Sequence, residues 1–295
     1  MRAAAPHPGR ASRFPALLLL LLQASRWRFW LYLAGPFLLG YTAGSPSLDS
    51  LRLPVFWALL LVFLLPANLL LYGINDLCDR DTDRLNPRKG TAELGLQQSQ
   101  ERALLIGVAV SAILLAGTLF WLPSPLARWL MLAFVALSVA YSAPPLRLKS
   151  RPVLDSASNI LYAVPGFVGY GISSGRPVPW EAVIGAGLWT AAMHLYSAIP
   201  DIESDLKAGL ATSATALGHH RALVACAVLW AGAAGMVTAL RVLWPWCLLA
   251  WCYPVAPLVL LLRPPRDVAR AYWYFPWVNA GLGMLAFFLL AGPRL

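Results

Sequence analysis

Long apolar stretches alternate with short polar ones along almost the whole chain. Nine stretches contain no Asp, Glu, Lys or Arg, and each has 16 to 22 residues. A helix needs about 20 apolar residues to cross a bilayer. The pattern therefore predicts an all-α integral membrane protein, a bundle of nine transmembrane helices at 29–44, 54–75, 103–122, 129–146, 157–173, 182–200, 222–240, 242–262 and 271–292.

The composition supports this interpretation. Of the 295 residues, 59% are hydrophobic and only 12% are charged. A soluble domain carries roughly 25% charged residues. Apolar stretches can also be buried helices of a soluble protein, but nine of them in one chain disfavour that alternative.

The basic residues indicate how the chain crosses the membrane. If the nine stretches are helices, the N-terminal segment and every second loop hold 18 of the 23 Lys and Arg residues. Positive charge accumulates on the cytoplasmic side. We therefore expect a multi-pass protein of the cytoplasmic membrane, with its N-terminus inside and its C-terminus outside. The basic residues are scattered over short loops, which disfavours nucleic acid as a partner.

Residues 1–25 precede this region and differ from it. The first dozen residues are rich in Ala, Pro and Arg, a composition typical of a disordered tail. The run PALLLLLLQAS at 15–25 has the character of a signal-peptide core, of an extension of the first helix or of an interfacial segment. We expect residues 1–25 to be disordered or interfacial, and 26–295 to form the membrane domain.

Two short acidic segments follow the second and the sixth apolar stretch. They are NDLCDRDTD (75–83) and DIESD (201–205), and they hold seven of the 13 acidic residues. Four spans separate them, so both lie on the cytoplasmic side. At 100° per residue, some of these side chains lie along one face of each predicted helix. They are Asn75, Asp76, Asp79 and Asp83 in the first segment, and Asp201 and Asp205 in the second.

Carboxylates that share a helix face repel one another, so a cation is expected nearby. Oxygen donors favour Mg²⁺, which often bridges carboxylates to substrate phosphates. The two segments together therefore predict a site for Mg²⁺ and a diphosphate. A solvated acidic helix end is the alternative for either segment alone.

Basic residues lie where a diphosphate would need them, although each also fits the role of a cytoplasmic topology anchor. The candidates precede the first span, follow the second and fourth spans, or follow the second acidic segment: Arg26, Arg88, Lys89, Arg147, Lys149, Arg151 and Lys207.

The two acidic segments resemble the paired motifs of the UbiA-type intramembrane prenyltransferases. Asn75-Asp76-x-x-Asp79-x-x-x-Asp83 is similar to the first motif, and Asp201-Ile-Glu-Ser-Asp205 to the second. The stretches SRWRFWLYLAGPFLLG, YSAPPLRLKSRPVLDSASN, YSAIPDIESD and VNAGLGM resemble the carotenoid-modifying branch, the lycopene elongases. One departure is Trp27, where the branch has Pro, and it weakens the assignment of Arg26 as a diphosphate ligand.

The resemblance implies a nine-helix fold and a Mg²⁺-dependent enzyme. Asn75, Asp79, Asp83, Asp201 and Asp205 would hold the metal, and Asp76 would bind metal or orient a ligand. An allylic diphosphate would then ionise, and the cation would be attacked by a lipophilic acceptor, lycopene or a related carotenoid, giving C45 or C50 products.

Such a cation must be shielded from bulk water, in a pocket between apolar helices. An aromatic face stabilises a cation by about 0.5–2 kcal/mol, and polar groups in membrane helices tend to face the interior. Tyr141, with Asp79 and Asp205, is our candidate for a catalytic role. The candidates for the acceptor pocket are Asn68, Tyr72, Asn159, Tyr162, His194 and Tyr196.

Other functions remain open from the sequence. The same fold could prenylate an aromatic quinone precursor, a chlorin alcohol or a glycerol phosphate ether, or it could cyclise the diphosphate. A cation transporter is disfavoured, because transporters place ion sites near the midplane of the membrane, whereas these carboxylates lie at one mouth.

Overall fold

The computed structural model describes residues 10–83 and 94–294, and helices are the only regular elements in them. The longer helices are α1 (Arg10–Ala24), α2 (Leu31–Gly44), α3 (Pro54–Leu64), α4 (Pro66–Asp83), α5 (Glu101–Trp121), α6 (Pro125–Ser142), α8 (Val164–Ser174), α9 (Trp180–Ala198), α11 (Ser213–Ala239), α12 (Cys252–Leu260) and α13 (Arg266–Ala291). The shorter ones are η1 (Trp27–Phe29), η2 (Leu48–Arg52), η3 (Gln98–Gln100), η4 (Leu148–Ser150), α7 (Leu154–Ala157), η5 (Ser158–Tyr162), η6 (Ile199–Asp201), α10 (Ile202–Lys207), η7 (Trp246–Trp251) and η8 (Gly292–Arg294).

Six helical segments of the described residues are long and apolar enough to cross a membrane: Pro54–Arg80, Gln98–Trp121, Pro125–Ser142, Trp180–Lys207, Ser213–Ala239 and Arg266–Arg294. The other three predicted spans are shorter or divided. Residues 29–44 begin at the last residue of η1 and contain the 14-residue α2. Residues 157–173 are divided mainly between η5 and α8, and 242–262 between η7 and α12. The protein is therefore a multi-pass membrane protein, and the count of nine spans stays a prediction.

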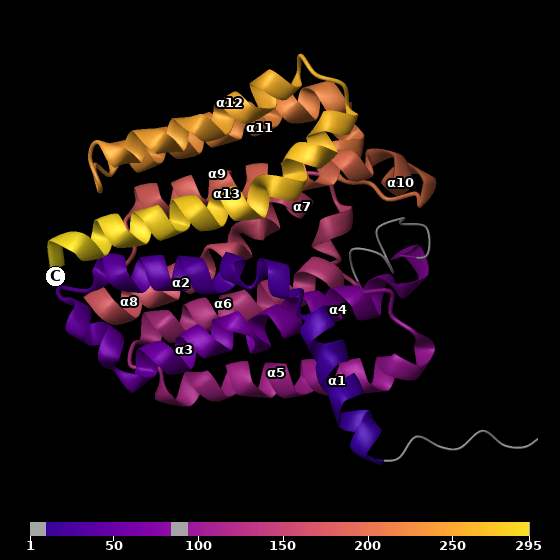
Figure 1. The fold of residues 1–295 in the computed structure, drawn as a ribbon, viewed down its shortest axis with the longest axis horizontal. Helices are drawn as coiled ribbons and strands as arrows, with labels where there is room; N and C mark the ends of the chain where they lie inside the picture. Colours follow the sequence, from indigo (N-terminus) through magenta and orange to yellow (C-terminus); the bar gives the residue numbers. More distant parts are fainter. Residues whose placement is uncertain (1–9, 84–93, 295) are drawn as a thin grey trace, which may run out of the picture.

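The helices form two packed groups that face each other (Figure 1). In the view of Figure 1, α11 and α12 lie at one edge and α5 at the other, with α9, α13, α2 and α6 between them. One apolar core is built from α2 to α8, and a second one from α9 to α13. Residues that are distant in sequence therefore meet where the two groups face each other.

Glycines allow α2 and α8 to approach closely. A Cβ at Gly40 would lie 2.0 Å from the carbonyl oxygen of Gly166, and one at Gly169 would lie 2.6 Å from that of Phe37. Small residues at such crossings let helix backbones pack by van der Waals contact, which drives helix association in membranes. This close packing fixes α8, and with it η5, relative to the first span.

The second predicted span is broken between α3 and α4. Pro66 begins α4 and has no N–H to continue the backbone ladder of α3. The fully buried Asn68 donates from Nδ2 to the carbonyl oxygens of Phe63 and Leu64, at 2.9 and 3.0 Å. Its amide thus satisfies carbonyls at the break. This corrects the expectation that Asn68 lines the acceptor pocket.

The last helix packs back against the first span. Asn279 of α13 donates to the hydroxyl of Tyr32 at 3.2 Å and accepts from that of Tyr253 at 2.8 Å. At the other end of the helix, Arg294 donates to the carbonyl oxygen of Ser45 at 3.0 Å. These polar contacts attach α13 along the length of α2.

The N-terminal segment is partly helical. Residues 10–24, within the segment that we expected to be disordered or interfacial, form α1, and residues 1–9 lie outside the described residues. Leu17, Leu18 and Leu19 of α1 are exposed. An interfacial position of α1 remains a prediction.

Candidate active site

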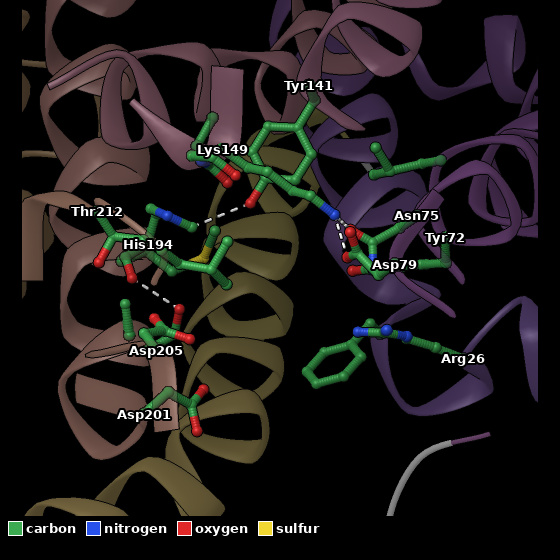
Figure 2. Close-up of a pocket in the computed structure, with 18 of the residues that line it drawn as sticks. Arg26, Tyr72, Asn75, Asp79, Tyr141, Lys149, His194, Asp201, Asp205 and Thr212 are labelled. Carbon is green, nitrogen blue, oxygen red and sulfur yellow. Dashed lines mark hydrogen bonds and ion pairs between the residues drawn. The ribbon is translucent and has the colours of Figure 1, made fainter. Parts of the chain in front are cut away.

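A cavity of about 260 Å³ lies between the two groups of helices (Figure 2). Twelve of the predicted site residues line it: Arg26, Tyr72, Asn75, Asp79, Tyr141, Arg147, Lys149, Asn159, Tyr162, His194, Asp201 and Asp205. Both acidic segments therefore contribute side chains to one cavity, together with three basic residues.

The first wall comes from α4. Asp79 accepts a hydrogen bond from Nη2 of Arg147 at 3.0 Å and is paired with Nζ of Lys149. The same Nζ donates to Oδ1 of Asn75 at 2.8 Å, and Oγ of Ser142 donates to that oxygen at 3.1 Å. The i, i+4 spacing of Asn75 and Asp79 places both on one face of α4. Two cations thus lie beside these oxygen atoms.

The loop after α6 delivers those two cations. Pro144 and Pro145 follow the end of α6, and proline cannot continue a helix. Arg147 then adopts a left-handed conformation with φ 39°, just before η4, which contains Lys149. Non-glycine residues held in this region concentrate at functional sites. The turn directs both side chains toward α4.

Asp76 does not line the cavity. It is only 1% exposed, and its Oδ1 accepts from Nη2 of Arg26 at 3.2 Å. The guanidinium group of Arg26 also lies over the ring of Tyr72, 4.7 Å from its centroid. Asp76 lies beside Arg26 and helps to position its guanidinium group. This corrects the prediction that Asp76 binds the metal.

The second wall comes from the segment that follows α9. Asp201 ends η6, Asp205 lies in α10, and both side chains are half-buried. Figure 2 shows this pair on a different side of the cavity from Asn75 and Asp79. Glu203, between them in the sequence, is exposed and pairs with Lys207 at 2.7 Å.

Some predicted diphosphate ligands do not line the cavity. Lys207 is 71% exposed in its pair with Glu203, and Arg151 donates to the carbonyl oxygen of Pro145 at 3.1 Å. Both are therefore corrected to surface residues. Arg88 and Lys89 lie outside the described residues. Asp83 ends α4, and its side chain is also outside the described part.

Aromatic side chains form the less polar part of the lining. The hydroxyl groups of Tyr72 and Tyr162 are 3.0 Å apart. The ring of Phe29 lies 6.0 Å from that of Tyr72, and the ring of Tyr32 lies edge-on, 6.2 Å from that of Tyr162. We did not anticipate Phe29 and Tyr32. Their signals in the sequence were their place close after Arg26 and within the stretch SRWRFWLYLAGPFLLG.

Tyr196 was expected in the acceptor pocket but lies in the second core. It is 2% exposed and packs against the rings of Trp230, Tyr272 and Phe275. Its predicted role is corrected to a core residue. Tyr272 of α13 lines the cavity in its place.

A buried carboxylate lies behind the cavity and was not anticipated. Asp155 is 0% exposed and accepts from the backbone N–H of Ser213 at 2.7 Å and from its Oγ at 2.5 Å. Burial raises the pKa of the Asp155 carboxyl, but its contacts with His194 and Ser213 outweigh burial and leave the pKa below its usual value. Its only sequence signal was the motif stretch LDSASN.

The donor atoms in the cavity are suited to one kind of metal site. Among residues 10–83 and 94–294, no three His, Cys, Asp or Glu side chains are close enough to hold a metal by themselves. Asn75, Asp79, Asp201 and Asp205 offer only oxygen atoms. Mg²⁺ prefers oxygen and commonly binds one or two carboxylates together with substrate phosphates. The donor set therefore fits Mg²⁺ shared with a phosphate.

Known proteins are similar to this chain in sequence and in fold. The chain is 45% identical to a lycopene elongase/hydratase of Halobacterium salinarum, covering 92% of this chain and 96% of that protein. It is 44% identical to a lycopene elongase/hydratase of Haloferax volcanii, covering 91% and 87%. A UbiA homolog from Archaeoglobus fulgidus, solved with GPP and Mg²⁺, superimposes with a TM-score of 0.68 at 23% identity, over 90% of this chain and 99% of that one.

The sequence model of the UbiA prenyltransferase family matches residues 29–289, which include every lining residue of the cavity except Arg26. Together with the two relatives, this match establishes the class of enzyme: the chain belongs to the UbiA prenyltransferase family.

Proposed function

We propose that the protein transfers a prenyl group from an allylic isoprenyl diphosphate to the end of lycopene or a related carotenoid, giving C45 and C50 products. The observation that carries the proposal is the single cavity that combines oxygen donors, basic side chains and aromatic rings. Similarity to two proteins named lycopene elongase/hydratase selects the carotenoid acceptor.

The basic residues would bind the diphosphate. Arg147 and Lys149 are held beside Asp79, and Arg26 enters the cavity from the start of the first span. A guanidinium group binds phosphate through paired hydrogen bonds, and an ammonium group acts as a point charge. These three cations provide the positive end of the site.

Asn75, Asp79, Asp201 and Asp205 are the residues that would hold Mg²⁺. When bound, the ion supplies positive charge that stabilises the departing diphosphate. Whether Asp83 joins them is a prediction about a side chain outside the described residues. Because Asp79 already has two cationic partners, metal binding there would free Arg147 and Lys149 to contact the phosphate oxygens.

The aromatic residues would protect the allylic cation. Phe29, Tyr32, Tyr72 and Tyr162 form a continuous set of ring contacts beside the charged part of the cavity. Ring faces stabilise a cation, and apolar walls keep bulk water from it. The tyrosines thus suit a reaction that passes through a carbocation.

The size of the cavity limits how the acceptor binds. Its volume of about 260 Å³ is below the ~300–1,000 Å³ typical of pockets for drug-sized ligands. A carotenoid is longer than such ligands, so only one end would enter, while the rest of the polyene stays among the lipid chains. This arrangement favours attachment at the ends of the acceptor.

The excess of basic residues in alternate loops supports a cytoplasmic mouth of the cavity and nine spans. A water-soluble diphosphate would then arrive from the cytoplasm, while the carotenoid arrives through the membrane.

Incubation of membranes containing the protein with labelled dimethylallyl diphosphate, lycopene and Mg²⁺ tests the proposal. We expect C45 and C50 carotenoids, and we expect a chelator to stop the reaction until Mg²⁺ is restored. Transfer only to an aromatic ring, a chlorin alcohol or a glycerol phosphate ether would show that the acceptor is that compound and not a carotenoid. A hydrocarbon formed without acceptor would indicate cyclisation, and Mg²⁺-dependent ion flux without donor consumption would indicate transport.

A further inference from the structure

Three polar side chains form a line from the cavity into the interior. The hydroxyl of Tyr141 lies 3.4 Å from Nδ1 of His194, and Nε2 of His194 lies 3.8 Å from Oδ2 of Asp155. Tyr141 and His194 line the cavity, whereas Asp155 is fully buried behind them. They come from α6, α9 and α7, so only the tertiary fold brings them together.

The position of Asp155 is fixed by its surroundings. The backbone N–H groups of Ser156 and Ser213 each donate to it at 2.7 Å, and Oγ of Ser213 donates at 2.5 Å. A buried carboxylate needs such donors to remain charged. The carboxylate is therefore a fixed negative charge behind the imidazole of His194.

This arrangement selects the form of the imidazole. A carboxylate opposite one ring nitrogen favours the proton on that nitrogen and leaves the other as an acceptor. With Asp155 facing Nε2, the lone pair of Nδ1 in His194 points toward the Tyr141 hydroxyl. A proton taken up at Nδ1 would create an imidazolium ion, whose charge Asp155 offsets.

The position of His194 along α9 suits contact with the prenyl chain. His194 precedes Asp201 by seven residues, a separation of roughly 10 Å along a helix. It therefore lies within α9, about two turns before Asp201, one of the oxygen donors that would hold the diphosphate. The carbon chain of a prenyl diphosphate held by Asp201 would extend toward this part of the cavity.

Prenyl transfer to an alkene needs a base in this part of the cavity. Addition of the allylic cation to a C=C bond leaves a second carbocation, which becomes neutral only when it, or a water that adds to it, gives up a proton. Asp79 is already paired with two cations at the other end of the site. His194 lines the cavity beside Tyr141 and has a ring nitrogen that can accept a proton.

Building on the proposed function, we propose that His194, reached through the hydroxyl of Tyr141 and positioned by Asp155, is the proton acceptor that ends the transfer. The electron pair of a C–H bond next to the cationic carbon becomes a C=C bond, and the proton passes through the Tyr141 hydroxyl to Nδ1 of His194. If water adds, a C–O bond forms and the same nitrogen takes the proton that water releases. The diphosphate has already left with the electron pair of its C–O bond, so no oxidant or reductant is needed.

The test compares two products of one reaction, elongated carotenoid and released diphosphate, in the unaltered protein and in H194Q. Glutamine keeps a polar side chain but cannot take the proton. We expect carotenoid formation to fall about 10²–10³-fold, with the donor KM within about two-fold of its original value. Diphosphate release should exceed carotenoid formation, because ionisation continues while the cation is quenched by other routes. Added imidazole should restore carotenoid formation in His194→Ala.

Matched variants separate the relay from a structural role. Ser213→Ala removes one of the hydrogen bonds that position Asp155, while the backbone N–H groups of Ser156 and Ser213 still donate to it, so it should uncouple release from transfer less than Asp155→Asn does. Asp155→Asn should uncouple them as H194Q does. His220→Gln, on α11 and outside the cavity lining, is the control for loss of a histidine and should stay coupled.

Three outcomes would overturn the inference alone, given an active unaltered protein. They are an H194Q protein within about three-fold of the original kcat, an H194Q protein that is slow but keeps the one-to-one ratio, or an Asp155→Asn protein that loses stability but keeps the one-to-one ratio. An unaltered protein that elongates no acceptor would overturn the proposed function, and this inference with it.

Discussion

The two walls of the cavity that carry the acidic segments share an i, i+4 spacing but differ in how the protein supports them. On α4, Asp76 and Asp79 are 1% and 9% exposed, and each has an arginine partner at 3.0–3.2 Å. Across the cavity, Asp201 and Asp205 are half-buried on the short elements η6 and α10. A buried carboxylate must be compensated by the protein itself, whereas a half-buried one is partly compensated by water.

The α4 wall therefore combines catalysis with folding, and the opposite wall is more specialised for the ligand. Asp79 connects α4 to the loop after α6 through Arg147 and Lys149, so it holds two parts of the fold together. Asp201 and Asp205 are only half-buried, so water can reach a side chain that replaces either one. Variants of the two walls should therefore differ in stability even where they agree in activity.

Asp79→Asn should have the largest effect. Loss of the carboxylate removes a metal ligand and leaves Arg147 and Lys149 without their buried anion, so we expect kcat to fall by about 10³-fold or more and Tm to fall as well. Donor consumption and thermal unfolding in detergent measure the two effects. A variant with unchanged Tm would show that the ion pairs do not support the fold.

Asp205→Asn should reduce kcat by about 10²–10³-fold while leaving Tm close to its original value. The carboxylate is half-buried on a six-residue helix, so water can solvate the amide that replaces it. The contrast with Asp79→Asn is the measurement. Equal losses of Tm in the two variants would remove the distinction between the walls, and full activity would remove Asp205 from the site.

Lys149→Ala should have an intermediate effect. Its ammonium group contacts both Asn75 and Asp79 and lines the cavity. We expect the donor KM to rise about ten-fold, with a smaller change in kcat, because a ground-state contact with the diphosphate is lost. Initial rates over a range of donor concentrations test this, and an unchanged KM would return Lys149 to the role of a topology anchor.

Lys207→Ala should have the smallest effect and serves as the control for Lys149→Ala. Its pair with Glu203 is on the surface, with both side chains more than two-thirds exposed. Exposed pairs contribute about 0–1 kcal/mol, so we expect kcat and KM to stay within about two-fold. A ten-fold rise in the donor KM would place Lys207 back at the diphosphate.

Local regularity made part of the site predictable. The spacings of Asn75 with Asp79 and of Asp201 with Asp205 are helical, and each pair lines the cavity. The partner of Asp76 was not predictable, because Arg26 is 50 residues away along the chain. For the same reason Asp155, which depends on Ser213 from another helix, could not be recognised from its own segment.

The fold was predictable to the extent that apolar length alone determines it. Six helical segments long enough to cross a membrane follow from the long apolar stretches. Hydrophobicity does not show where an apolar stretch is divided into two helices. The break before Pro66 is an example: the carbonyl groups of Phe63 and Leu64 accept hydrogen bonds from the side chain of Asn68. For this reason Asn68 was expected in the acceptor pocket, whereas it bonds the backbone at the break.

The attachment of α13 to α2 has a consequence for biosynthesis. Tyr272, near the start of α13, is one wall of the reaction chamber, and the polar contacts at Asn279 and Arg294 hold that wall in place. A ribosome makes α13 after the segments that carry the two acidic motifs. A growing chain that has not reached α13 therefore has both motifs but lacks the wall at Tyr272, so its cavity would shield a carbocation less well from water.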